Sequence, residues 1–207
     1  MDPAKPPRFA QLTFDQMNEA QRRAAEQILA TAKRADGPGG RHMAKSGEFP
    51  GPYSFLLRSP ELASRWRHLA DYIRFETSVP PRLNELAILI QARFWTAQFE
   101  WWAHYPLALR AGLPQAIADD LRIGKRPAGM QPDEEAVYDF CVELMREHRV
   151  ADATFAKLKA QFTEQQIVDL VAVAGFYATV SMILNTVEAA VPAGEAAPLA
   201  PLTDPLR

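Results

Sequence analysis

Helix signals extend through nearly the whole sequence of 207 residues. No segment shows the regular alternation of polar and apolar residues that predicts a strand. Apolar residues instead recur at helical spacing, and proline and glycine separate the helical segments from one another. The chain is long enough to bury a full core, as one large or two small domains. We therefore predict an all-α fold with one principal domain.

Capping residues and prolines mark where the helices begin. Thr13 and Gln16 form a capping pattern, Ser59 precedes a proline at a first helical position, and Thr163 with Gln166 forms a second capping box. The segment after Thr163 is apolar nearly all round, which predicts a central helix. Helices are expected at about 13–34, 60–79, 82–111, 114–122, 132–149 and 163–188, with a short one capped by Asp152.

The same pattern divides the chain into four parts. We expect an N-terminal arm at 1–12, a helical extension at 13–80, a core at 81–190 and an extended tail at 191–207, which could wrap around a neighbour. The extension contains a long Gly/Pro loop at 35–54. Loops of that length inside compact domains are often functional.

Composition excludes several classes of protein. Lys and Arg number 23 against 25 Asp and Glu, so the net charge is -2 and no nucleic acid or anionic membrane partner is expected. The first residues lack the apolar stretch of a secretory signal, and no window approaches the roughly 18 uninterrupted apolar residues of a membrane span. Cys141 is the single cysteine, which excludes an internal disulfide and is interpreted as a small core residue. A cytoplasmic protein is therefore expected.

Two carboxylates and an imidazole interrupt the apolar and aromatic stretch from Arg82 to Leu113. Ionisable groups are costly to bury unless they are paired or used, so Glu85, Glu100 and His104 predict a site within the core. Glu100 and His104 stand four residues apart, on one helix face and within hydrogen-bonding reach. A carboxylate beside an imidazole fixes its tautomer, which suits a general acid or base. The alternative is an ordinary helix-stabilising or solvated pair.

Glu85 is harder to place beside the other two. On one continuous helix it would lie roughly 22 Å from Glu100. The helix must therefore break near Trp95 and Thr96 and double back, or a neighbouring subunit must supply one group. The aromatic residues of this stretch favour a pocket wall or a subunit interface. They are Phe94, Trp95, Phe99, Trp101, Trp102 and Tyr105. No third ligand at characteristic spacing supports a metal site.

Four sequence patterns resemble the carboxymuconolactone decarboxylase family, which shares its all-α fold with the alkylhydroperoxidase D proteins. They are R-x-x-E-L at 82–86, E-W-x-x-H at 100–104, an A-G-L ending at 113 and a G-F-Y…L-N helix at 175–185. The resemblance implies an alkylhydroperoxidase D-like helical bundle, here with an extra N-terminal helical layer. It also implies a homo-oligomer, trimer-based or dimeric, and a reaction without a cofactor.

Redox members of this superfamily use a Glu, a CxxC pair and a His as a proton relay. Glu85 and His104 fall where that Glu and His are expected, whereas Ala97 and Glu100 occupy the two cysteine positions. Without a thiolate nucleophile the usual peroxidase or disulfide-reductase chemistry of the family cannot operate. CxxC-dependent peroxidase activity is therefore disfavoured.

The cysteine-free branch of the family implies a carbon–carbon lyase of aromatic-compound catabolism. Its substrate would be a small cyclic carboxylic acid or lactone of the 4-carboxymuconolactone type. His104 is then expected to donate a proton, Glu100 to orient it, and Glu85 to act as a second acid/base or relay group. The predicted substrate-binding residues are Arg82, as a carboxylate anchor, and Trp101, Tyr177 and Asn185 as lining groups. A lactone hydrolase or isomerase, or a non-catalytic oligomeric binding protein, remains an alternative.

Overall fold

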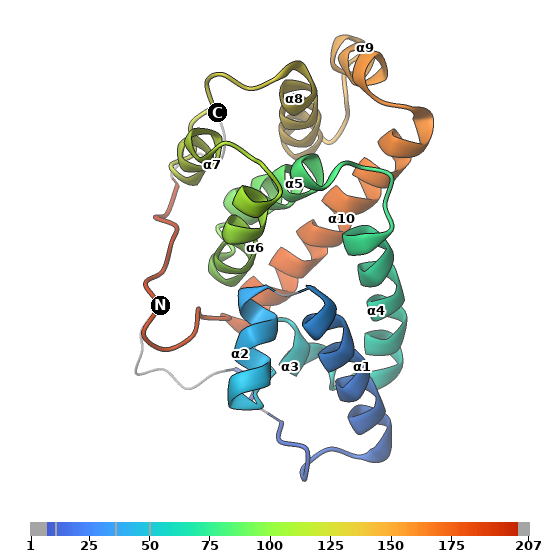
Figure 1. The fold of residues 1–207 in the computed structure, drawn as a ribbon, viewed down its shortest axis with the longest axis vertical. Helices are drawn as coiled ribbons and strands as arrows, with labels where there is room; N and C mark the ends of the chain where they lie inside the picture. The colour runs from blue at the N-terminus through green and yellow to red at the C-terminus, as the bar shows by residue number, and fades with distance from the viewer. Residues whose placement is uncertain (1–7, 11, 36, 50, 203–207) are drawn as a thin grey trace.

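The computed structural model describes residues 8–202, with the exception of residues 11, 36 and 50. Within these residues the chain forms ten helices and no strand, which confirms the all-α prediction (Figure 1). The helices are α1 (Glu19–Ala35), α2 (Pro38–Ser46), α3 (Tyr53–Leu56), α4 (Pro60–Phe75), α5 (Pro81–Phe94), α6 (Gln98–Arg110), α7 (Gln115–Arg122), α8 (Pro132–Glu147), α9 (Asp152–Gln161) and α10 (Glu164–Val187).

Helices α5 and α10 cross in the middle of the molecule (Figure 1). Residues 86–90 of α5 are completely buried, which places this helix within the main core. Among the described helices, α10 alone is long and apolar enough to cross a membrane. The sequence had predicted no such segment. However, 56% of that window is buried inside the protein, as in the core helix of a globular domain.

The N-terminal helices form a layer with a hydrophobic cluster of its own. Ile28 of α1, Met43 of α2 and Leu57 beside α3 belong to this cluster, and Trp66 of α4 packs against it and against the main core. Helix α2 also contacts α6, and α4 contacts α10. The extra N-terminal layer is therefore present, while the boundaries of separate domains stay a prediction.

The predicted loop at 35–54 is wrong, because this segment contains α2 and the first two residues of α3. Pro38 occupies the first turn of α2, and Gly47 ends the helix in the left-handed conformation with φ of 72°. The glycines that suggested a loop instead allow close packing, since a Cβ on Gly40 would lie 2.4 Å from the Ala32 carbonyl oxygen of α1.

Two predicted helix starts also shift. Helix α1 begins after Asn18, whose side chain accepts from the Gln21 amide at 2.9 Å while the Gln21 side chain accepts from the Asn18 amide at 3.0 Å. Thr13 and Gln16 form only a preceding turn. Asp152 is the first residue of α9 rather than its cap. The capping box of Thr163 and Gln166 is confirmed.

The C-terminal tail has no helix after α10 and lies along its own chain as far as it is described. The Gln98 side chain exchanges two hydrogen bonds with the backbone of Leu199, at 2.8 and 2.9 Å. Arg93, fully buried on α5, donates to the Ala200 carbonyl at 2.8 Å. These contacts fasten the tail to α5 and α6. Of the predicted arm, residues 1–7 and 11 lie outside the described residues, as do residues 203–207 of the tail.

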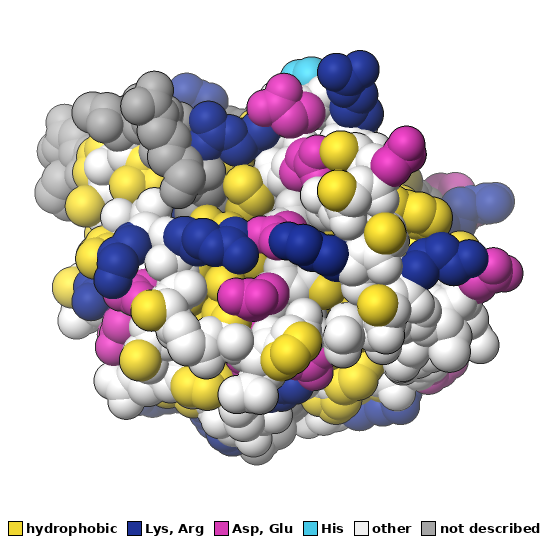
Figure 2. Space-filling view, turned by 90° about the horizontal axis from the view of Figure 1, so that it is seen from above, with side chains coloured by type: hydrophobic (Ala, Val, Ile, Leu, Met, Phe, Trp, Pro, Cys, Tyr) yellow, Lys and Arg dark blue, Asp and Glu magenta, His cyan; other side chains and the backbone are white. Residues whose placement is uncertain are grey.

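Basic and acidic side chains stand next to one another on the end of the molecule that carries α8 and α9 (Figure 2). Asp139 of α8, for example, pairs with Arg126 and, at 3.1 Å, with Lys157 of α9. The described part of this face therefore has no field of a single sign.

Candidate acid–base site

A sharp break between α5 and α6 builds the site. Helix α5 ends at Phe94, Thr96 adopts a positive φ of 51°, and α6 begins at Gln98. Asn185 of α10 donates to the Trp95 carbonyl at 2.7 Å and so holds the break in place. The predicted break near Trp95 and Thr96 is confirmed, and the contact between α5 and α6 forms within one chain.

Because α6 doubles back along α5, Glu85 meets His104. The Glu85 Oε2 atom lies 2.8 Å from the His104 Nδ1 atom, and both side chains are largely buried. With Nδ1 engaged, Nε2 is the ring nitrogen left without a protein partner among the described residues. The ring edge of His104 packs against Tyr177 of α10, with the centroids 5.0 Å apart. The pair therefore has a fixed orientation and one nitrogen available for proton transfer.

Glu100 is not the hydrogen-bond partner of His104, so that prediction is wrong. One turn earlier on α6, its Oε2 atom accepts a hydrogen bond of 3.0 Å from the Ser181 hydroxyl of α10. Its Oε1 atom is buried and has no hydrogen-bond partner among the described residues. Burial raises the pKa of Glu100 well above its usual range, and the Ser181 bond offsets this only in part. Burial therefore favours the neutral form of the Glu100 carboxyl group.

His104 and Glu100 line a cavity of about 100 Å³ between the N-terminal layer and the main core. Cavities on the order of 150 Å³ hold a benzene ring, and this one has about two thirds of that volume. Its walls are mainly apolar. They include Trp66 of α4, Phe99 and Leu107 of α6, and Phe176 of α10, while Gly39 and Met43 of α2 contribute from the segment predicted as a loop.

Arg74 of α4 is a cavity residue that the sequence reading missed. Burial lowers its pKa, but the nearby Tyr177, Tyr53 and Glu85 raise it more, so the net shift is upward. The signal was present in the sequence, because Arg74 continues the stripe of Ala63, Trp66 and Ala70 that faces the cavity. A charge on an apolar stripe is the same pattern that pointed to Glu100 and His104.

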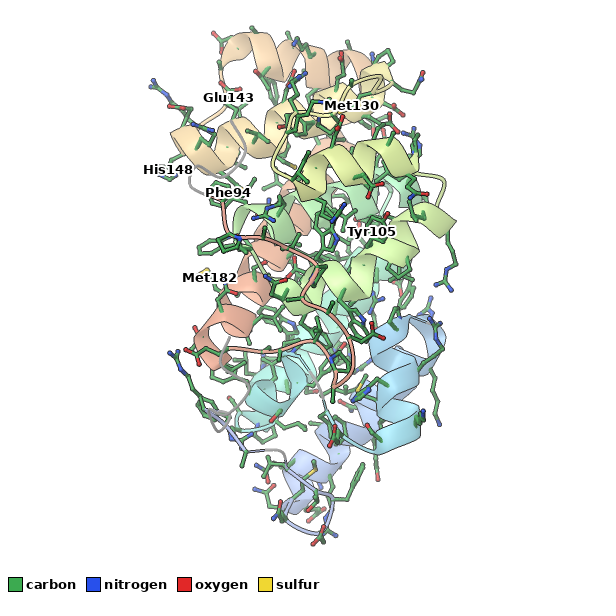
Figure 3. All side chains as sticks on the ribbon, turned by 90° about the vertical axis from the view of Figure 1, so that its left-hand side faces the viewer. Phe94, Tyr105, Met130, Glu143, His148 and Met182 are labelled. Atoms are coloured by element: carbon green, nitrogen blue, oxygen red, sulfur yellow. The ribbon has the colours of Figure 1, made fainter. Side chains whose placement is uncertain are left out.

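The predicted substrate-binding residues divide into one that lines the cavity and three that do not. Tyr177 lines it. Arg82 pairs instead with Asp133 at 2.6 Å and with Glu134, so its charge is used between α5 and α8. Trp101 is a core residue that stacks on Tyr105 with centroids 6.0 Å apart, and Asn185 holds the α5–α6 break. Figure 3 shows Tyr105 on α6, from where its hydroxyl donates to Asp119 of α7 at 3.1 Å.

Cys141 lies on α8, is fully buried and is not part of the cavity wall. Burial raises the pKa of its thiol to about 12, so almost no thiolate forms near neutral pH. Its interpretation as a core residue is confirmed.

Within the part of the chain that the structure describes, no group of three His, Cys, Asp or Glu side chains could hold a metal ion.

No protein-family model and no curated protein sequence matches this chain. Solved structures do match it. The alkylhydroperoxidase AhpD core of an uncharacterized peroxidase-related protein from Ralstonia eutropha JMP134 is 16% identical, with a TM-score of 0.69 over 92% of this chain and 95% of that chain. The debrominase Bmp8 in its apo form is 14% identical, with a TM-score of 0.65 over 88% of this chain and 91% of that chain.

A third neighbour is a protein of unknown function from Agrobacterium tumefaciens, suggested to be the antioxidant defence protein AhpD. It is 18% identical, with a TM-score of 0.61 over 67% of this chain and 95% of that chain. These similarities show that this chain has the alkylhydroperoxidase D-like helical fold. The match over 92% of the chain also includes most of the residues before Pro81, so the N-terminal layer recurs in at least one neighbour.

Proposed function

We propose that this protein is a cofactor-free decarboxylase that acts on a small cyclic carboxylic acid or lactone of the 4-carboxymuconolactone type, in aromatic-compound catabolism. The observation that carries the proposal is the Glu85–His104 pair, whose histidine lines a small, mostly apolar cavity. This site contains groups that move protons and no thiol that moves electrons. One neighbour in fold is a debrominase, so this scaffold supports enzymes outside peroxide chemistry.

The reaction requires a place for electrons and a source for one proton. The bond between the ring carbon and the carboxylate breaks, carbon dioxide leaves, and the electron pair delocalises through the ring alkene into the lactone carbonyl. The imidazolium of His104 then delivers a proton from Nε2 to carbon and regains one from solvent. Glu85 holds the ring through Nδ1 and stabilises its positive charge, the role that we had expected of Glu100.

Glu100 suits a different task in this scheme. As a neutral acid with an unpaired oxygen, it donates a hydrogen bond to the carbonyl oxygen where negative charge develops. An ionised carboxylate at the same place would repel that charge.

The family resemblance further leads us to propose a homo-oligomer located in the cytoplasm, and light scattering of the purified protein measures its size.

Release of carbon dioxide from 4-carboxymuconolactone tests the function. We expect the wild type to release it and His104→Gln to lower kcat by about 100- to 10,000-fold, the usual contribution of general acid catalysis. Glu85→Gln should cause a smaller loss, because the imidazole keeps its place but loses the carboxylate that orients it. His148→Gln, a change at the exposed end of α8 (Figure 3), is the matched control and should leave the rate unchanged.

Two results would redirect the proposal. Ring opening without carbon dioxide release would favour the lactone hydrolase, and isomerised product would favour the isomerase. Carbon dioxide release that His104→Gln leaves intact would contradict the proposed role of the Glu85–His104 pair.

A further inference from the structure

We infer that the cavity contains an anion subsite, in which Arg74 and the hydroxyls of Tyr53 and Tyr177 hold a carboxylate that the substrate keeps throughout the reaction. The inference rests on the proposed function, because it states which residues hold the carboxylate that a substrate of the 4-carboxymuconolactone type keeps.

The first observation concerns the guanidinium of Arg74. Arg74 lines the cavity, and among the described residues no carboxylate lies within ion-pair distance of its guanidinium, although Glu85 and Asp71 are near enough to raise its pKa. One ring contact is present, with the guanidinium carbon 5.5 Å from the centroid of Phe75. Packing over a ring leaves the in-plane N–H donors available. Arg67, a second arginine of the cavity wall, differs because Asp71 neutralises it at 2.6 Å.

Enclosing a cation without a direct ion-pair partner is costly, even with the more distant charges of Glu85 and Asp71 nearby. Of the two arginines in the cavity wall, Arg67 already has an ion-pair partner. Arg74 could therefore gain one by binding an anion. Its planar fork of donors matches the two oxygens of a carboxylate.

The second observation concerns the hydroxyls of Tyr53 and Tyr177. Tyr177 is 3% exposed, and its hydroxyl has no hydrogen-bond partner among the described residues, although it lines the cavity. Buried hydroxyls are rarely left unpaired, so this one is suited to a ligand. Tyr53 of α3 lines the same cavity, and its hydroxyl also has no hydrogen-bond partner among the described residues. Both tyrosines lie near enough to Arg74 to raise its pKa. Three donors from three helices therefore face the same space.

Transition-state energetics decide which carboxylate these donors hold. A departing carboxylate loses its negative charge as carbon dioxide forms. Donors that bind it would therefore stabilise the ground state more than the transition state and slow the reaction. Binding a carboxylate that keeps its charge only positions the ring. We therefore assign the Arg74 subsite to the second, non-reacting carboxylate of such a substrate, which leaves the departing carboxylate near His104.

Binding of benzoate and of benzamide, measured by isothermal titration calorimetry, tests this subsite. The two rings have nearly the same shape, and only benzoate is charged. We expect the wild type to bind benzoate about 10- to 100-fold more tightly, as for hydrogen bonds to a charged group. Arg74→Gln should bring the two affinities within about threefold of each other and leave benzamide binding unchanged, which reports an intact cavity. Arg74→Lys should retain part of the preference.

Arg65→Gln is the matched control, since Arg65 lies on the same helix but pairs with Glu61 on the surface, and it should keep the full preference for benzoate. Equal affinities in the wild type, no binding of benzoate, or an undiminished preference in Arg74→Gln would each overturn the inference. Turnover plays no part in this measurement. Anion-selective binding without carbon dioxide release would leave the subsite standing and contradict the proposed function. Turnover without Arg74-dependent selectivity would do the reverse.

Discussion

Single residues of this protein acquire their chemistry from burial more than from their neighbours in sequence. Glu100 and His104 are four residues apart on one helix, and this spacing predicted that they would bond to each other. In the structure their partners are Ser181 and Glu85, which come from two other helices. Sequence spacing could identify the three ionisable groups of the site. It could not assign the pairs, because pairing depends on how α5, α6 and α10 cross.

The neutral state of Glu100 leads to a prediction about stability. Its folded-state pKa is raised, so between about 4.5 and that raised value the unfolded chain loses a proton that the folded chain keeps. Rising pH therefore lowers the stability that this group contributes, by at most about 1.4 kcal/mol per pH unit. Glu100→Gln removes this term. Urea unfolding should find the variant gaining stability relative to the wild type between pH 5 and pH 8.

The control for this prediction is the same comparison with Glu135→Gln, an exposed residue of α8. Its difference from the wild type should stay flat over the same pH range. A flat difference for Glu100→Gln as well would show that Glu100 is ionised in the folded protein.

At the scale of elements, the helices of the core were predictable and the wall of the cavity was not. Periodicity and proline placed α4, α8 and α10 close to their true positions, because each has an apolar face and a recognisable start. The segment that became α2 was read as a loop because Gly39 and Gly40 weaken any helix signal. Its helix is stabilised by packing against α1 and α6, which is tertiary information.

Neighbouring glycines of α2 allow a matched test of that packing. A Cβ on Gly40 would lie 2.4 Å from the backbone oxygen of Ala32, whereas a Cβ on Gly39 would lie 3.7 Å from the Phe99 ring. Gly40→Ala should therefore destabilise the protein by about 1–3 kcal/mol, as overpacking does. Gly39→Ala should be neutral or stabilising by up to about 1 kcal/mol, because alanine favours a helix. Chemical unfolding measures both, and equal effects would contradict the close approach of α1 and α2.

At the scale of the whole molecule, the fold is that of alkylhydroperoxidase D-like proteins and the chemistry is expected to differ. The resemblance in sequence pointed to this fold and to the missing cysteines at Ala97 and Glu100. It also suggested Arg82 as the carboxylate anchor, whereas in the structure Arg82 pairs with Asp133 and Glu134 of α8 and does not line the cavity of His104. The arginine that lines the cavity, Arg74, comes from the N-terminal layer, outside the stretch that carried the resemblance.

The single thiol provides a prediction for the intact molecule. Because burial raises the pKa of Cys141 to about 12, the folded protein should not react with a thiol reagent such as dithionitrobenzoate at pH 8. Unfolded protein should react with one equivalent per chain. Cys141→Ala should keep full catalytic activity. Rapid labelling of the folded protein, or activity lost in this variant, would return thiol chemistry to consideration.

The central claim is that this cavity moves protons, and the product formed in deuterium oxide tests it most directly. Incubation of 4-carboxymuconolactone with the wild type should release one carbon dioxide and place one deuterium on ring carbon, as read by NMR, and His104→Gln should suppress both. Carbon dioxide release with deuterium incorporation unaffected by His104→Gln, or consumption of the substrate without loss of carbon dioxide, would contradict the account.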